Sequence, residues 1–140
     1  IQFVNGVYNA GLGNTLFITG AQAGILMTVS RGGISNDSVA FEVQPDVLDS
    51  FVVEAGGGGS IGAQDTDTAF NIDITALDQY GNVLDVGPNA YDGAGDTVDI
   101  ADSTGTIAPV TSGVFTAGII LNKRIYFLYL FINVRSQYYN

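Results

Sequence analysis

A regular alternation of apolar and polar residues in the middle of the chain is the strongest constraint on its fold. Every second residue from Phe70 to Ala76 is apolar, and the residues between them are Asn, Asp and Thr. A period of two is that of a β-strand with one buried face. Similar patterns predict strands at Thr15–Thr19, Ile25–Val29, Ser38–Val43, Phe51–Ala55, Val98–Ile100 and Gly113–Ile119.

Turn-forming residues separate these segments, which predicts many short strands and no helix. The chain contains 19 glycines, and only 13% of its residues are charged, whereas helical proteins are rich in Leu, Glu, Lys and Arg. Short strands joined by frequent turns are typical of an antiparallel β-sandwich. The turns are expected at Asn5-Gly6, Arg31-Gly32-Gly33, Gly56–Gly59, Tyr80-Gly81-Asn82 and Asp92–Gly95.

Charge and residue usage exclude several classes of function. A net charge of −10 repels phosphate backbones, so we expect no nucleic-acid partner. The absence of Cys and His excludes thiolate metal sites, thiol catalysis and the usual general base. The longest apolar run, Ile125–Val134, is too short for a membrane helix, which needs about 20 residues, so we expect no membrane span.

A short sequence near the start of the chain recurs near its end. Gly6–Leu12 (GVYNAGL) and Gly113–Ile119 (GVFTAGI) lie 107 residues apart and share four identical positions. A repeat of this length matches one β-sandwich domain of about 100 residues. We therefore expect residues 1–44 to be the closing strands of one repeat and residues 45–120 the opening strands of the next. Residues 121–140 would then form an apolar C-terminal strand that either closes its own domain or is donated to a neighbour.

The segment around the strongest strand also resembles a known family. Phe70–Val83 (FNIDITALDQYGNV), with its strand followed by an Asp-x-x-Gly-Asn turn, is similar to prokaryotic immunoglobulin-like domains. These are the tandem modules of invasin- and intimin-type adhesins and of many bacterial and archaeal surface proteins. Asp102–Pro109 and Gly33–Val43 resemble other strands of that family. The resemblance implies an immunoglobulin-like sandwich, an extracellular or cell-surface location, and a stalk, filament or adhesin role without catalysis. The first residue, Ile1, fits a mature or excerpted segment.

Acidic residues around the Asp-x-x-Gly-Asn turn raise the question of a calcium site. Asp78, Asn82 and Asp85 offer the oxygen ligands that calcium prefers. The alternative is that Asp78 only stabilises a turn in which Gly81 or Asn82 takes positive φ. Further acidic residues crowd the following loops, without the spacing of an EF-hand, at Asp92, Asp96, Asp99 and Asp102.

The apolar tail is the candidate subunit interface. A strand at this position would be apolar on both faces, so it must be buried either in its own domain or in a neighbouring copy. Basic residues beside the tail could meet the acidic body of another subunit, giving a homo-oligomer or an open homopolymer. The candidate interface residues are Ile125, Phe127, Tyr129 and Phe131, together with Lys123 and Arg124.

Two other functions compete with a structural role. A monomeric secreted module could bind a carbohydrate or a receptor, with sugars stacking on Tyr80, Tyr91, Tyr138 or Tyr139 if these residues cluster on one exposed face. An enzyme such as a glycosidase would need two carboxyl groups facing each other across a pocket. Without a nucleophile motif, we expect no enzyme.

Overall fold

The structure, a computed structural model, describes residues 17–66, 68–105, 107 and 110–126. All regular elements in this part of the chain are β-strands, and all strand pairs are antiparallel, which confirms the predicted all-β class. The chain divides into two compact units, Ile1–Gln44 and Pro45–Asn140.

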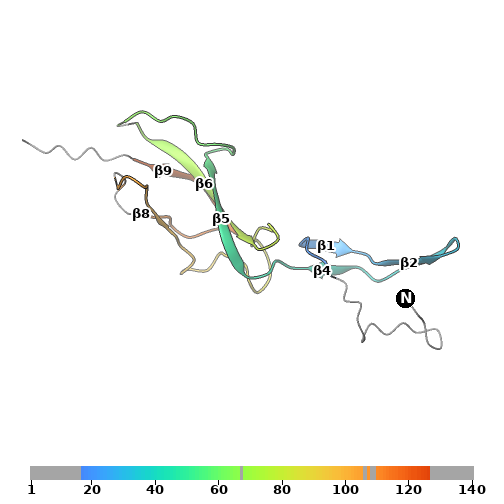
Figure 1. Ribbon diagram of the computed structural model, residues 1–140. Coiled ribbons are helices and arrows are strands. Elements are labelled where there is room, and N and C mark those ends of the chain that lie inside the picture. Colours follow the sequence, from blue (N-terminus) through green and yellow to red (C-terminus); the bar gives the residue numbers. More distant parts are fainter. Residues whose placement is uncertain (1–16, 67, 106, 108–109, 127–140) are drawn as a thin grey trace, which may run out of the picture. The chain divides into compact units, whose positions relative to one another are not determined.

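The described part of the first unit is a long hairpin (Figure 1). Strand β1 (Gln22–Ile25) pairs with β4 (Phe41–Val43), and β2 (Thr28–Arg31) pairs with β3 (Ile34–Asp37). The expected strand at residues 25–29 is therefore broken at residues 26–27. Gly32 and Gly33, both with positive φ, form the tight turn between β2 and β3, as the sequence predicts. The strand predicted at Ser38–Val43 forms only from Phe41, and Val39, which precedes it, is 86% exposed.

The second unit is built on a three-stranded sheet in the order β5-β6-β9 (Figure 1). Its central strand β6 (Phe70–Asp78) contains the alternating segment, and its even-numbered residues from Ile72 to Asp78 are buried. Strands β5 (Leu48–Ala55) and β9 (Ile119–Ile125) flank it, and a short pair, β7 (Asp99–Ile100) and β8 (Val110–Thr111), lies in the connection between β6 and β9.

The hydrophobic core lies between one face of this sheet and the connection that follows β6. Leu84 and Phe115 from the connection are almost fully buried against the sheet. The connection is fixed by backbone hydrogen bonds, including those from the Leu84 amide to the Ala76 carbonyl and from the Tyr91 amide to the Leu84 carbonyl. The other buried apolar residues are Ile72, Ile74, Ala76, Ile107, Ile120 and Ile125.

The segment Gly113–Ile119, expected to be a strand, is mainly a turn that leads into β9. Ala117 and Gly118 both have positive φ, and Thr116 and Ile119 exchange two backbone hydrogen bonds around them. This is the geometry of a two-residue hairpin turn. The Gly118 carbonyl also accepts a hydrogen bond from the Ala76 amide, which anchors the turn on β6.

Candidate functional site

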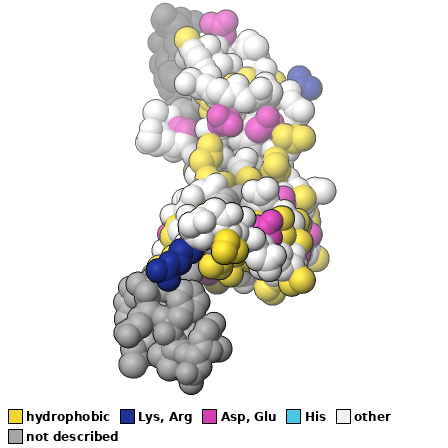
Figure 2. Space-filling model, turned by 90° about the vertical axis from the view of Figure 1, so that its right-hand side faces the viewer, with side chains coloured by type: hydrophobic (Ala, Val, Ile, Leu, Met, Phe, Trp, Pro, Cys, Tyr) yellow, Lys and Arg dark blue, Asp and Glu magenta, His cyan; other side chains and the backbone are white. Residues whose placement is uncertain are grey.

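The outer strand β5 leaves apolar side chains uncovered on the core side of the sheet. The register places Phe51 opposite Ala76 and Val53 opposite Ile74, so these side chains share the buried face of β6. Val53 is nonetheless 51% exposed and Phe51 37% exposed. Among the described residues, β5 pairs only with β6, so its other edge is open. Hydrophobic side chains are visible at the surface in Figure 2.

A cluster of three aromatic rings, those of Phe51, Tyr91 and Phe115, covers part of the apolar surface on the core side of β5. Tyr91 packs edge-on against Phe115, with ring centroids 4.9 Å apart, and against Phe51 at 5.6 Å. The tyrosine hydroxyl donates a hydrogen bond to the Thr97 carbonyl at 3.4 Å. Burial, together with the nearby carboxylate of Asp96, raises the pKa of Tyr91. Tyr91 is therefore partly buried with its ring packed against the core, and it is not the freely exposed ring predicted to stack on sugar.

Among the other tyrosines proposed to bind sugar, Tyr80 is exposed at the turn after β6. Tyr138 and Tyr139 lie outside the described residues. Since the Tyr91 ring packs against the core, the described tyrosines of this set, Tyr80 and Tyr91, do not form an exposed aromatic platform.

Asp78 organises the turn after β6 rather than offering ligands to a metal. One carboxylate oxygen accepts hydrogen bonds from the amides of Tyr80 and Asn82 at 2.8 and 2.9 Å. The other accepts them from the Asp46 amide and the Asn82 side-chain nitrogen at 3.0 and 2.8 Å. Burial of the carboxylate raises its pKa, but these hydrogen bonds outweigh that effect and lower the pKa of Asp78 from 3.8 to about 2.

The predicted calcium set of Asp78, Asn82 and Asp85 is therefore not supported by the geometry. Four N–H groups already occupy the Asp78 oxygens, Asn82 turns its amide nitrogen toward them, and Asp85 is exposed. Within the described ranges no group of three or more acidic side chains could hold a metal ion. The turn's positive φ is supplied by Gly81.

Two acidic residues of the later loops, Asp96 and Asp102, stabilise their own turns of the chain. Asp96 accepts a hydrogen bond from the Gly93 amide at 2.7 Å. Asp102 accepts hydrogen bonds from the amide and hydroxyl of Thr104 and from the Ile107 amide. The crowding of these carboxylates along the sequence thus reflects a succession of turns.

The predicted interface residues lie either in β9 or outside the described residues. Ile125 is 2% exposed and packs in the core of its own unit, so its assignment to a subunit interface is wrong. The Lys123 ammonium donates a hydrogen bond to the Thr111 carbonyl at 3.0 Å, and the exposed Arg124 lies over the Tyr126 ring at 5.1 Å. Strand β9 runs across the expected boundary at residue 120. Phe127, Tyr129 and Phe131 lie outside the described residues.

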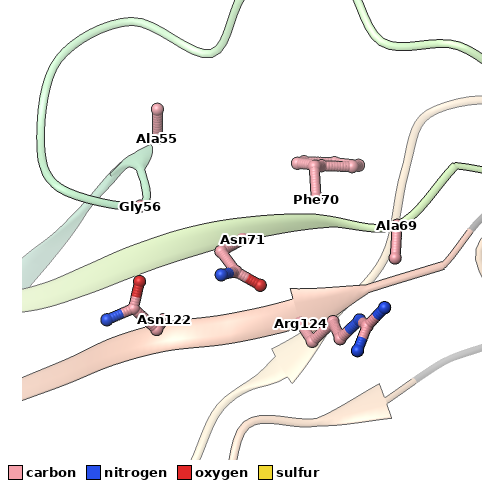
Figure 3. A pocket seen from close by; sticks show the side chains of 7 residues that line it. All are labelled: Ala55, Gly56, Ala69, Phe70, Asn71, Asn122 and Arg124. Carbon is pink, nitrogen blue, oxygen red and sulfur yellow. The ribbon is translucent and has the colours of Figure 1, made fainter.

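An open, polar hollow of about 650 Å³ lies where the end of β5, the start of β6 and strand β9 meet (Figure 3). Asn71 and Asn122 flank it from β6 and β9, and Arg124 is the charged side chain in its lining. Gly56 is required here, because a Cβ at this position would lie 2.8 Å from the Asn71 Cβ.

Comparison of the chain with protein-family models, with curated proteins and with solved structures gives no match. The described part of the chain forms no helix long and apolar enough to cross a membrane.

The open core side of β5 is the feature that the sequence did not predict. Its pattern of apolar residues signals a buried strand, and only the structure shows which part of that face remains uncovered. The roles of Leu84, Tyr91 and Phe115 were missed as well, because isolated apolar residues in a loop-rich connection produce no periodic signal. The repeated Gly-Val-aromatic sequence was the one available clue to Phe115.

Proposed function

We propose that this protein is a non-catalytic structural module of an extracellular stalk, filament or adhesin, which joins other copies by β-strand complementation. The observation that carries the proposal is the open side of β5, where the core-facing Phe51 and Val53 remain substantially exposed and one strand edge is unpaired among the described residues. The immunoglobulin-like family resemblance supports the same role.

An open strand edge and an uncovered apolar face favour the same kind of partner. Unpaired peptide groups at a sheet edge are a template for another strand, and the side chains beside them provide hydrophobic contact. Covering Val53, Phe51 and Leu48 would contribute about 25 cal/mol for each Å² of apolar surface removed from water, from which the entropy cost of association is subtracted. Head-to-tail contacts of this kind give open polymers when they do not close into a ring.

The chemistry of the chain supports a structural role over catalysis. The sequence has neither His nor Cys. The buried carboxylate Asp78 is saturated with N–H donors and has its pKa lowered, which makes it a poor general acid or base near neutral pH.

The proposal is tested by placing a charge on the open side of β5. Val53→Lys should shift the protein from concentration-dependent assemblies to monomers in sedimentation velocity and electron microscopy, because the ammonium would have to be desolvated in the contact. Val114→Lys is a matched control, since Val114 is similarly exposed but lies outside the strands. The proposal would be contradicted if Val53→Lys, with an unchanged far-UV circular dichroism spectrum, assembled at the same protein concentration as the wild type.

A further inference from the structure

The hollow at the junction of β5, β6 and β9 is lined by three polar side chains, two amides and a guanidinium. Asn71 and Arg124 are paired in the register of β6 with β9, so their side chains leave the sheet on the same face. Asn122 comes from the same strand as Arg124, and the three side chains lie along the β6-β9 pair (Figure 3). The rest of the lining consists of Gly56 and apolar residues.

A β-bulge in β9 places Asn122 at the hollow. The register with β6 shifts by one residue between Ile72 and Ile74, so that two residues of β9 stand opposite Asp73. Asn122 has a φ of 56°, which few residues other than glycine adopt, although asparagine tolerates it. Its amide donates a hydrogen bond of 2.7 Å to the Asp73 carboxylate. A bulge redirects a side chain, and this one is fixed in place by Asp73.

Glycine at position 56 leaves the space between the two amides open. A Cβ there would lie 2.8 Å from the Asn71 Cβ and 3.1 Å from the Asn122 Oδ1. The loop that follows Gly56 is held by the second oxygen of Asp73, which accepts a hydrogen bond from the Gly57 amide at 2.8 Å. Asp73 therefore supports both sides of the hollow, and each of its oxygens already accepts a hydrogen bond from a backbone amide.

The polar groups of the hollow have hydrogen-bonding capacity that the described part of the chain does not use. Among the described residues, the side-chain amides of Asn71 and Asn122 and the Arg124 guanidinium form no hydrogen bond or ion pair. Arg124 lies over the Tyr126 ring at 5.1 Å, a contact that restricts the guanidinium without occupying its N–H groups. With 14 acidic residues in the chain, a shortage of carboxylates does not explain this unpaired arginine.

These groups match the chemistry of a sugar that carries a carboxylate. A side-chain amide both donates and accepts hydrogen bonds, as sugar hydroxyls do. A guanidinium binds a carboxylate through two parallel hydrogen bonds. We infer that the hollow binds an acidic saccharide, whose carboxylate pairs with Arg124 and whose hydroxyls bond to Asn71 and Asn122. Its volume of about 650 Å³ lies within the range of small-molecule sites, about 300–1,000 Å³.

The position of the hollow favours a saccharide over an acidic peptide. Extended peptides are held by an unpaired strand edge or by apolar pockets for their side chains. The hollow lies over strands that are paired with each other: the Gly56 amide donates to the Asn71 carbonyl at 2.8 Å, and Asn71 is paired with Arg124. Saccharide binding here goes beyond the proposed strand complementation and does not depend on it.

Isothermal titration calorimetry of the full-length protein tests the inference. The probes are oligosaccharides of galacturonic, glucuronic and sialic acid, with a neutral galactose oligosaccharide for comparison. We expect at least one acidic probe to bind, and Arg124→Gln to weaken its binding at least about tenfold, since hydrogen bonds between charged groups are lost. Arg31→Gln is the matched control: it removes the same charge from an exposed arginine that does not line the hollow, and binding should stay within about twofold.

A second variant guards against loss of folding. Asn122→Gly removes the amide but suits the positive φ, so it should keep the far-UV circular dichroism spectrum and weaken binding as well. The inference would be overturned if no acidic probe bound at up to about 5 mM, or if the neutral oligosaccharide bound equally well. Equal weakening by Arg31→Gln would indicate attraction by overall charge and would also overturn it. Tetraglutamate binding as tightly as the saccharides would replace the saccharide with an acidic peptide.

Discussion

Replacing Asp78 by Asn should destabilise the second unit strongly, because this carboxylate joins three parts of the chain. It accepts four hydrogen bonds, from Asp46, Tyr80 and Asn82, while it is only 2% exposed. An asparagine keeps one acceptor oxygen but presents an NH₂ group to backbone amides that also donate. At least one buried donor then loses its partner.

The size of the effect follows from the pKa shift and the lost hydrogen bonds. Lowering the pKa of Asp78 from 3.8 to about 2 corresponds to a stabilisation of about 2 kcal/mol. An unsatisfied buried donor adds about 1–3 kcal/mol. Because the two figures describe partly the same hydrogen bonds, they are not summed in full, and we expect Asp78→Asn to lower the free energy of unfolding by about 2–4 kcal/mol at neutral pH.

The pH dependence gives the sharper test. Because the pKa of Asp78 is lower in the folded than in the unfolded chain, the unfolded chain takes up the proton first as the pH falls. The contribution of the charge is complete well above pH 3.8 and is lost as the pH falls toward about 2. The difference in stability between wild type and Asp78→Asn should shrink over this range.

Urea denaturation followed by far-UV circular dichroism measures this difference. Asp85→Asn is the matched control: it removes a carboxylate from the same region, but Asp85 is exposed, so a change within about 0.5 kcal/mol is expected. Calcium should leave the stability of the wild type unchanged. The reasoning would be refuted by an Asp78→Asn protein as stable as the control, or by a calcium-dependent stabilisation that this variant loses.

Three further predictions concern the core. Phe115→Ala should cost about 3–5 kcal/mol in urea denaturation, because the ring is fully buried in the aromatic cluster; a cost below about 1 kcal/mol would contradict its role. Gly118→Val should lower the free energy of unfolding by about 2 kcal/mol or more, because φ is +72° and a Cβ would lie 2.9 Å from the Leu84 carbonyl oxygen. Gly62→Ala is the control, since a Cβ at Gly62 would lie in open space, and it should be nearly neutral in the same assay. Tyr91→Phe should remove the phenol that ionises above pH 10.0 in an ultraviolet titration, and its persistence in the variant would contradict the assignment.

The strand with regular alternation was predictable because burial of one face fixes its pattern. Strand β6 begins at Phe70 as expected, and the turn after it takes positive φ at Gly81. The sequence predicts a strand at Gly113–Ile119, and this prediction is wrong for most of that segment. Ala117 and Gly118 are the centre of a tight turn.

The less regular parts could not be predicted because their burial depends on distant contacts. Ile125 looks like the first residue of an apolar tail, yet its pairing opposite Phe70 places it in the core of its own unit. The sequence makes Asp78 a candidate metal ligand, but in the structure its carboxylate oxygens accept hydrogen bonds from the amides of Asp46 and Asn82. The sequence alone shows which polar and apolar side chains the chain has. It does not show which hydrogen-bond donors or neighbouring side chains each of them contacts in the folded state.

The order of the three-stranded sheet determines how it would respond to tension. The chain enters β5 at Leu48, opposite Asp78 at one end of β6, and leaves β9 at Ile125, opposite Phe70 at the other end. A force that pulls these two points apart acts along the strands and across their hydrogen bonds. The backbone hydrogen bonds of the β5-β6 pair and of the β6-β9 pair must then break together, not one after another. The sheet is therefore arranged to resist a force applied along its strands.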